Sequence, residues 1–104
     1  MKVYIASPYS NGDKEENVMR QINAFHALVT HGHEAFAPNL FHYVDIHYHF
    51  SDEWWLEYDL KWLGVCDAVL RLSGESNGAD REVARAKELG KKVYYSLSEI
   101  VAER

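Results

Sequence analysis

Apolar positions along this chain repeat with two different periods, which predicts short strands separated by helices. The strand-like runs are rich in β-branched and aromatic residues and are bounded by turn residues. They cover residues 2–6, 34–38, 66–72 and 93–95. The helical segments start after capping or turn residues and stop near glycines. They cover residues 14–31, 51–63 and 79–89, and a short last helix is expected to begin at Ser96 or Ser98.

The first helix carries the clearest signals of the three. Asp13 is a good capping residue, and Glu16 three positions later completes the outline of a capping box. The apolar positions expected to face the core are Val18, Ile22, Phe25, Leu28 and Val29. The segment 39–50, by contrast, holds aromatic and histidine residues without a clear period. We predict a loop there.

Strands that alternate with helices of this length indicate βαβ units, and therefore a parallel sheet with helices on both faces. The expected fold class is α/β, a small Rossmann-like or flavodoxin-like three-layer sandwich with about four strands. We expect one domain over residues 1–104. Ligands bind outside the carboxyl ends of the strands in such sheets. This rule singles out the loops at 7–12, 39–50 and 73–78.

The amino-acid composition limits which kinds of molecule this protein is expected to bind. Sixteen Asp and Glu residues against eleven Lys and Arg residues give a net charge of −5. This balance argues against a nucleic-acid polymer, because phosphate backbones are held by clustered basic residues. No apolar run approaches the roughly 20 residues that a membrane span needs, and Cys66 is the one cysteine. We expect a cytoplasmic protein whose partner is a small molecule or another protein.

The turn that precedes the helix at 79–89 is a candidate anion site. Ser76 offers a hydroxyl, and Gly78 allows backbone N–H groups to approach a ligand at the positive end of the helix dipole. An ordinary helix cap explains the same residues. Glu82 lies in the first turn, where the dipole alone favours a carboxylate and is expected to lower its pKa.

Asp59 is the more informative acidic residue. At helical spacing it borders Trp55 and Trp62, so its carboxyl group is expected to be desolvated and its pKa raised. The alternative is that it points to solvent and pairs with Lys61. Asp67, at the start of a strand, either binds a ligand hydroxyl or caps the connection before it.

Three histidines, at positions 42, 47 and 49, raise the question of a metal site. Their spacings of five and two fit no standard ligand pattern, and a loop that lines a pocket contains such residues as well. We therefore predict no metal, with a metal-dependent hydrolase that uses these histidines as the weaker alternative.

Three segments together resemble the nucleoside 2-deoxyribosyltransferase superfamily, and most closely its 2′-deoxynucleoside 5′-monophosphate N-glycosidase branch. They are VYIASPY (3–9), DLKWLGVCD (59–67) and SNGADRE (76–82). The resemblance implies that Glu82 is the nucleophile and that Asp59 assists the departing base. It also implies that Ser76 and Gly78 contact a 5′-phosphate.

The implied reaction is cleavage of the N-glycosidic bond of a nucleoside or nucleoside 5′-monophosphate, by hydrolysis or transfer. We also predict no cofactor, because a reaction carried by two carboxyl groups requires none. Tyr4, Ser7 and Tyr9 would line the sugar site, and Asp67 would support the pocket. Candidates for stacking on the base are Tyr43, Trp54 and Trp55. The resemblance and the aromatic content lead us to expect a homodimer or a higher oligomer. The alternative function is a nucleotide-binding sensor module without turnover.

Overall fold

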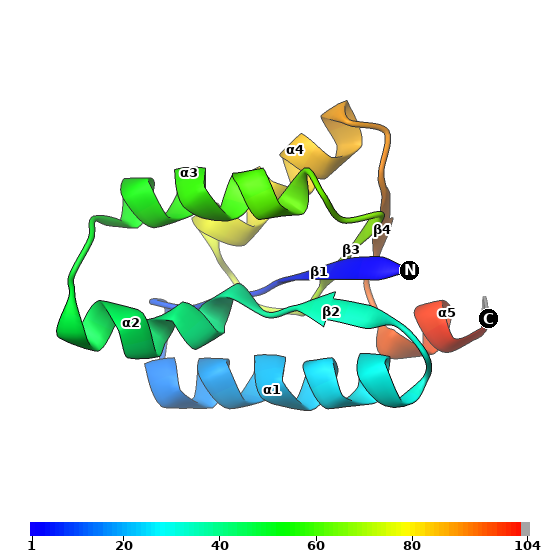
Figure 1. Ribbon diagram of the computed structural model, residues 1–104, viewed down its shortest axis with the longest axis horizontal. Helices are drawn as coiled ribbons and strands as arrows, with labels where there is room; N and C mark the ends of the chain where they lie inside the picture. Colours follow the sequence, from blue (N-terminus) through cyan, green and yellow to red (C-terminus); the bar gives the residue numbers. More distant parts are fainter. Residues whose placement is uncertain (103–104) are drawn as a thin grey trace.

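A sheet of four parallel strands forms the centre of the computed structural model, which describes residues 1–102 (Figure 1). The strand order is β2-β1-β3-β4. The strands are Lys2–Ala6 (β1), Glu34–Phe36 (β2), Ala68–Arg71 (β3) and Lys92–Tyr94 (β4). Every neighbouring pair is parallel, so the predicted α/β class with about four strands is confirmed.

Helices cover both faces of this sheet and complete a three-layer sandwich (Figure 1). Helices α1 and α5 lie on one face, and α3 and α4 lie on the other. The helices are Lys14–Thr30 (α1), His42–His47 (α2), Asp52–Leu63 (α3), Asn77–Glu88 (α4) and Leu97–Ala102 (α5). The side chains of Asp13, Ser51 and Ser76 each accept a backbone N–H bond from the first turn of the helix that follows.

Alternation along β1 divides the core into two clusters. Val3 and Ile5 pack toward α1 and α5, whereas Tyr4 and Ala6 pack toward α3 and α4. All four side chains are fully buried, so β1 is the central strand of the fold. Cys66 is also buried in the second cluster, as expected for a core cysteine. Within residues 1–102, no helix has the length and apolar character needed to cross a membrane.

The buried face of α1 differs from the predicted apolar stripe. Leu28 is buried, but Phe25 and Val29 are 40% and 45% exposed. Two polar residues, Asn17 and Gln21, are buried in their place. They lie on this face because their amides bond to the loops at the carboxyl ends of the strands.

The prediction of a loop at 39–50 is wrong for most of that segment. Residues Pro38–Phe41 form a 3-10 turn and continue into α2. No side chain caps either start. The segment is held instead by tertiary contacts, because the Asp45 carboxylate accepts bonds from Phe50 N at 2.9 Å and Trp55 Nε1 at 2.7 Å. Sequence periodicity does not reveal contacts of this kind.

Candidate active site

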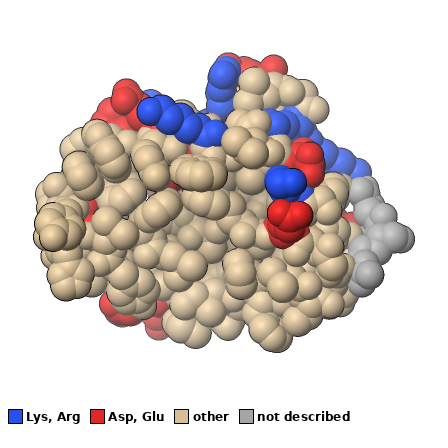
Figure 2. Space-filling view, viewed as in Figure 1, with Lys and Arg blue, Asp and Glu red and all other residues tan. Residues whose placement is uncertain are grey.

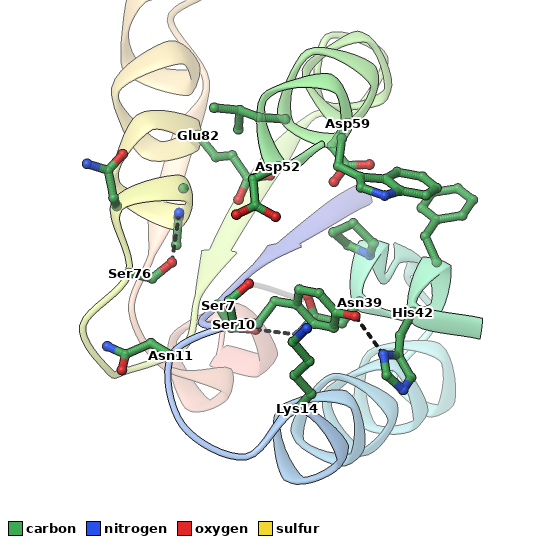
Figure 3. A pocket seen from close by; sticks show the side chains of 18 of the residues that line it. Ser7, Ser10, Asn11, Lys14, Asn39, His42, Asp52, Asp59, Ser76 and Glu82 are labelled. Carbon is green, nitrogen blue, oxygen red and sulfur yellow. Dashed lines mark hydrogen bonds between the residues drawn. The ribbon is translucent and has the colours of Figure 1, made fainter. Parts of the chain in front are cut away.

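A cleft of about 530 Å³ opens at the carboxyl ends of the strands (Figure 3). It lies where the strand order reverses, since β1 is followed in the chain by a crossover to one side and β3 lies on its other side. All three loops expected to face a ligand contribute to its walls, and α3 adds another. Charged side chains in the lining are Lys14, Asp45, Asp52, Glu53, Asp59, Glu75, Arg81 and Glu82.

Glu82 projects into this cleft from the second turn of α4, with 6% of its surface exposed. The prediction that it lies in the first turn is wrong, because the helix begins at Asn77. Its Oε2 accepts a hydrogen bond from the hydroxyl of Tyr4. Burial raises the pKa of Glu82 to about 7, although the Tyr4 bond and the nearby charge of Arg71 lower it. The expectation that the helix dipole would hold this pKa low is therefore wrong, because desolvation is the larger effect.

Asp59 faces the same cleft from α3 (Figure 3). Its Oδ1 is buried and has no hydrogen-bond partner among the described residues. Burial, and then the charge of Glu82, raise the pKa of Asp59 to about 8. The expected desolvation is confirmed, and an orphaned buried oxygen of this kind is suited to a ligand donor or a transferable proton.

The two carboxyl groups therefore titrate as an interacting pair in a shared environment. The Tyr4 bond and the charge of Arg71 favour the ionised form of Glu82, whereas burial and the charge of Glu82 favour the protonated form of Asp59. Near neutral pH the cleft can hold one carboxylate and one carboxylic acid. Such a pair can attack a carbon from one side and protonate a leaving group on the other.

Tyr4 does not line the cleft, contrary to its expected place in a sugar site. It is fully buried in the core beneath Glu82, and its ring stacks on Phe36 with a centroid separation of 5.6 Å. Its hydroxyl positions the Glu82 carboxylate from below. Burial and the neighbouring Glu82 charge raise the pKa of Tyr4 well above its usual value, so the phenol keeps its proton.

Ser76 and Gly78 lie at the start of α4, on the rim of the cleft. The Ser76 hydroxyl accepts a bond from Ala79 N at 3.1 Å, so the cap reading of this serine is confirmed. A Cβ atom built on Gly78 would meet nothing within 4 Å, which leaves open space beside the helix end. An anion has room to approach the α4 amides there.

Gly74 allows the loop at 73–76, before α4, to pack closely against the loop at 7–12. Its φ of +121° favours glycine, and a Cβ atom there would lie 2.7 Å from the Pro8 side chain. Asn11 adds a bond from Nδ2 to the Glu75 carbonyl at 2.8 Å. The two loops that flank the cleft are therefore fixed to each other.

Ser7 lines the cleft as expected, and a buried amide network holds it there. Gln21 donates from Nε2 to Ser7 Oγ at 2.9 Å and to the Ile5 carbonyl at 3.1 Å. Its Oε1 accepts from Asn39 N at 2.9 Å. The Asn39 amide donates in turn to the Pro8 carbonyl at 3.1 Å. This network joins β1, α1 and the 3-10 turn under the floor of the cleft.

Sequence analysis did not identify Gln21 or Asn39, although both line the cleft. A signal was present in the chain. Asn17, Gln21, Ala24 and Leu28 lie at helical spacing on one face of α1. Two amides in line with core residues indicate buried polar contacts, and buried amides require partners.

Tyr9 also lines the cleft, in agreement with its expected place. Its hydroxyl lies 2.5 Å from His42 Nδ1, and His42 Nε2 lies 3.0 Å from Glu15 Oε1. The other histidine of this corner, His49, pairs with Asp45 at 3.1 Å. Within residues 1–102, no three His, Cys, Asp or Glu side chains are grouped to hold a metal ion.

Asp67 is not brought to the cleft, so its expected role in supporting the pocket is wrong. It precedes β3 and lies at the opposite, amino-terminal edge of the sheet. Its Oδ2 accepts a bond from Lys2 N at 2.7 Å, and its own N–H donates to the Lys2 carbonyl. The residue fastens the start of β1 to the connection before β3.

Of the three aromatic side chains proposed to stack on a base, Trp55 lines the cleft and the other two do not. Its indole stacks on Phe41, another lining residue, with centroids 5.2 Å apart. Trp54 stacks instead on Phe50, and Tyr43 lies half exposed on α2. The aromatic wall is therefore built from Phe41 and Trp55.

A family model described as a domain of unknown function, DUF7768, matches residues 1–96. The chain belongs to this family. No curated protein matches the chain significantly.

Solved structures relate the DUF7768 fold to enzymes. A 2-deoxyribosyltransferase from the psychrotolerant bacterium Bacillus psychrosaccharolyticus superposes with a TM-score of 0.69 and 26% identity, covering 89% of this chain and 69% of that one. The CMP N-glycosidase BcmB of Clostridium botulinum superposes with a TM-score of 0.58 and 20% identity, covering 89% of this chain and 66% of that one. The DUF7768 chain therefore has a nucleoside 2-deoxyribosyltransferase-like fold, as its motifs indicated. It spans about two thirds of the length of these two neighbours.

Proposed function

We propose that this chain cleaves the N-glycosidic bond of a nucleoside or nucleoside 5′-monophosphate, by hydrolysis or by transfer to a second base. The observation that carries the proposal is the pair of buried carboxyl groups, Glu82 and Asp59, that face one cleft with their pKa values raised to about 7 and about 8. The two solved neighbours, one a deoxyribosyltransferase and the other a CMP N-glycosidase, support the same class of reaction.

The reaction takes two displacement steps at one carbon. Glu82 attacks the anomeric carbon, the bond from that carbon to the base nitrogen breaks, and Asp59 gives its proton to the departing base. Water or a second base then attacks the same carbon, releases the sugar from Glu82 and gives up a proton to Asp59. The first step needs a carboxylate on one face of the sugar and an acid at the departing base, and the second step needs the conjugate base of that acid, because both transition states resemble an oxocarbenium ion.

The surroundings suit these two roles. Tyr4 donates to Glu82 Oε2, so Oε1 is the oxygen left for attack. The orphaned Oδ1 of Asp59 is available to a base, and it lies on the helix that also carries Trp55. A base bound beside Trp55 and Phe41 would leave its sugar to face Glu82, and the 5′ substituent would extend toward Ser76, since all four residues line the same cleft.

The lining is richer in carboxylates than in cations, and this balance bears on the 5′-phosphate. Arg81 is engaged by Glu53 in a two-pronged ion pair at 2.9 and 3.0 Å. Lys14 is the other basic residue of the lining, with its Nζ 5.3 Å from the centre of the Tyr9 ring. A phosphate at Ser76 would therefore depend on the α4 amides more than on basic side chains.

Release of free base tests the proposal. The wild-type chain, Glu82→Gln and Asp59→Asn are incubated with 2′-deoxynucleosides and their 5′-monophosphates, and the base is separated by chromatography. Glu57→Gln on α3 and Glu88→Gln on α4 are matched controls, because both side chains are exposed and lie outside the cleft lining. We expect full activity in both controls.

Two comparisons separate the roles of the carboxyl groups. Glu82→Gln should abolish release from every substrate, whereas Asp59→Asn should spare substrates whose leaving group needs no proton, such as a nitrophenyl deoxyriboside. Near-normal rates in Glu82→Gln would refute the mechanism. Tight binding by the wild-type chain without release of any base would favour the sensor function instead.

A further inference from the structure

A line of three side chains runs from the surface of the molecule into the cleft. Glu15 Oε1 lies 3.0 Å from His42 Nε2, and His42 Nδ1 lies 2.5 Å from the hydroxyl of Tyr9. Glu15 is exposed, whereas His42 and Tyr9 are partly buried and line the cleft. The mechanism proposed above makes no use of these contacts.

The chemistry of the three groups fixes the direction of their hydrogen bonds. An ionised carboxylate only accepts, so His42 must carry a proton on Nε2 and donate it to Glu15. The Nδ1 atom of the neutral ring then has a lone pair and accepts the proton of Tyr9. The Tyr9 hydroxyl has one proton, and His42 accepts it. Toward the cleft, the phenolic oxygen can therefore only accept a hydrogen bond.

The Tyr9 phenol keeps the proton that this arrangement requires. Burial raises its pKa, and the charges of Asp45, Asp52 and Glu15 raise it further. Among the described residues, the hydroxyl oxygen of Tyr9 has no hydrogen bond besides the one to His42. Its remaining lone pairs are therefore available to a ligand.

The location indicates which part of a ligand meets this oxygen. His42 lies at the end of the cleft beneath Asp59 and far from Ser76 in the view of Figure 3. Phe41 and Trp55 form the aromatic wall near His42, since Phe41 directly precedes it and stacks on Trp55. A flat base against this wall would turn an edge toward Tyr9.

We propose that Tyr9, held as an acceptor by His42 and Glu15, makes the cleft select bases that carry an exocyclic amino group over bases with a carbonyl at that position. This inference rests on the proposed function, because it assumes that a nucleobase occupies the aromatic end of the cleft. Tyr9 is the specificity-determining residue, and His42 and Glu15 are positioning residues. An amino group donates to the Tyr9 oxygen, whereas a carbonyl oxygen would face it acceptor to acceptor.

Free bases test the selection without turnover. Adenine is compared with hypoxanthine, and cytosine with uracil, by quenching of tryptophan fluorescence at pH 8. We expect the wild-type chain to bind each amino base about threefold to tenfold more tightly than its carbonyl partner, the value of one neutral hydrogen bond. Tyr9→Phe removes the acceptor and should bring both ratios close to one.

Glu15→Lys tests the line of contacts itself, because a lysine can only donate to His42 Nε2. The imidazole proton must then move to Nδ1, which donates to the Tyr9 oxygen and frees the phenol proton for the cleft. The preference should fall to one or invert in favour of the carbonyl bases. Glu16→Lys is the matched control. It changes the charge by the same amount as Glu15→Lys, and Glu16 is exposed and does not line the cleft.

Each outcome has a definite meaning. Retention of the wild-type ratios in Glu15→Lys, or equal loss in Glu16→Lys, overturns the inference, because charge or general disturbance would then explain the effect. If the wild-type chain releases base from nucleosides but binds the paired bases equally, the inference is wrong and the proposed function stands. If it neither binds a base nor releases one, both are wrong.

Discussion

Removal of the Tyr4 hydroxyl should change how the cleft titrates while leaving its shape intact. Tyr4 lies in the core and donates to Glu82 Oε2, so this bond stabilises the ionised form of Glu82. A hydrogen bond to a charged group contributes about 1.5 to 3 kcal/mol. One pKa unit corresponds to about 1.4 kcal/mol. Tyr4→Phe should therefore move the pKa of Glu82 upward by about one to two units.

The consequence for catalysis depends on the position of Asp59. In the wild-type chain the Tyr4 bond and the charge of Arg71 favour ionised Glu82, whereas burial and the charge of Glu82 keep the proton on Asp59. A rise of about one unit in the pKa of Glu82 lowers its ionised fraction, so kcat/KM on the acidic side of the optimum should fall about tenfold.

The assay is base release measured from pH 5 to pH 10, compared with Tyr95→Phe as a control whose side chain is exposed and outside the cleft lining. We expect the acidic limb of the kcat/KM profile to move upward in Tyr4→Phe and to stay in place in Tyr95→Phe. An acidic limb that does not move in Tyr4→Phe would show that Glu82 does not govern it.

Three further results are expected. Because burial raises the pKa values of Glu82 and Asp59 above those of the unfolded chain, the folded state binds more protons between about pH 4 and pH 8 and loses stability as the pH rises through that window. The Tm should drop by several degrees from pH 5 to pH 8, and by less in Asp59→Asn; an equal drop in both would contradict the assignment. Ser76→Ala should cost about 1 kcal/mol in denaturant unfolding, as for the loss of a helix cap, and should weaken 5′-monophosphates more than nucleosides in competition; equal weakening would argue against a phosphate at Ser76. Ile46 is 60% exposed and Tyr48 is 73% exposed, and much of the face shown in Figure 2 is free of charged side chains. Sedimentation should therefore show a dimer or higher oligomer that Ile46→Lys disrupts, whereas a 12.0 kDa monomer at micromolar concentration would contradict this.

The parts of the fold that the sequence predicted are those with local causes. Helix α3 begins directly after Ser51, whose hydroxyl accepts a bond from Trp54 N three residues later, and a serine at this position is a signal visible in the sequence. Helix α2 has no side-chain cap and depends on Asp45 bonding to Phe50 and to Trp55. Contacts between elements fix such a segment, so no local pattern predicts it.

In the candidate site, too, some features were predictable from the sequence and others depended on the folded chain. The three loops were predictable, since the topology of a parallel sheet brings them to one edge. The two carboxyl residues were singled out by the family resemblance and, for Asp59, by its helical spacing to Trp55 and Trp62. The helix-dipole argument gave the wrong direction for the pKa of Glu82, because it could not include the burial that the rest of the chain imposes. Asp67 was misplaced because its role followed from the resemblance, although a residue at the start of a strand lies at the amino-terminal edge of a parallel sheet. Tyr4 was misplaced because the sequence did not show that its side chain is buried in the core beneath Glu82.

A glycosyl ester on Glu82 would test the central claim most directly. The wild-type chain is quenched in acid during turnover of a 2′-deoxynucleoside, and its intact mass and peptides are measured by mass spectrometry. We predict a mass increase of one deoxyribosyl group on the peptide that contains Glu82, and no such increase in Glu82→Gln. Base release without any adduct, or an adduct on another residue that persists in Glu82→Gln, would contradict the account.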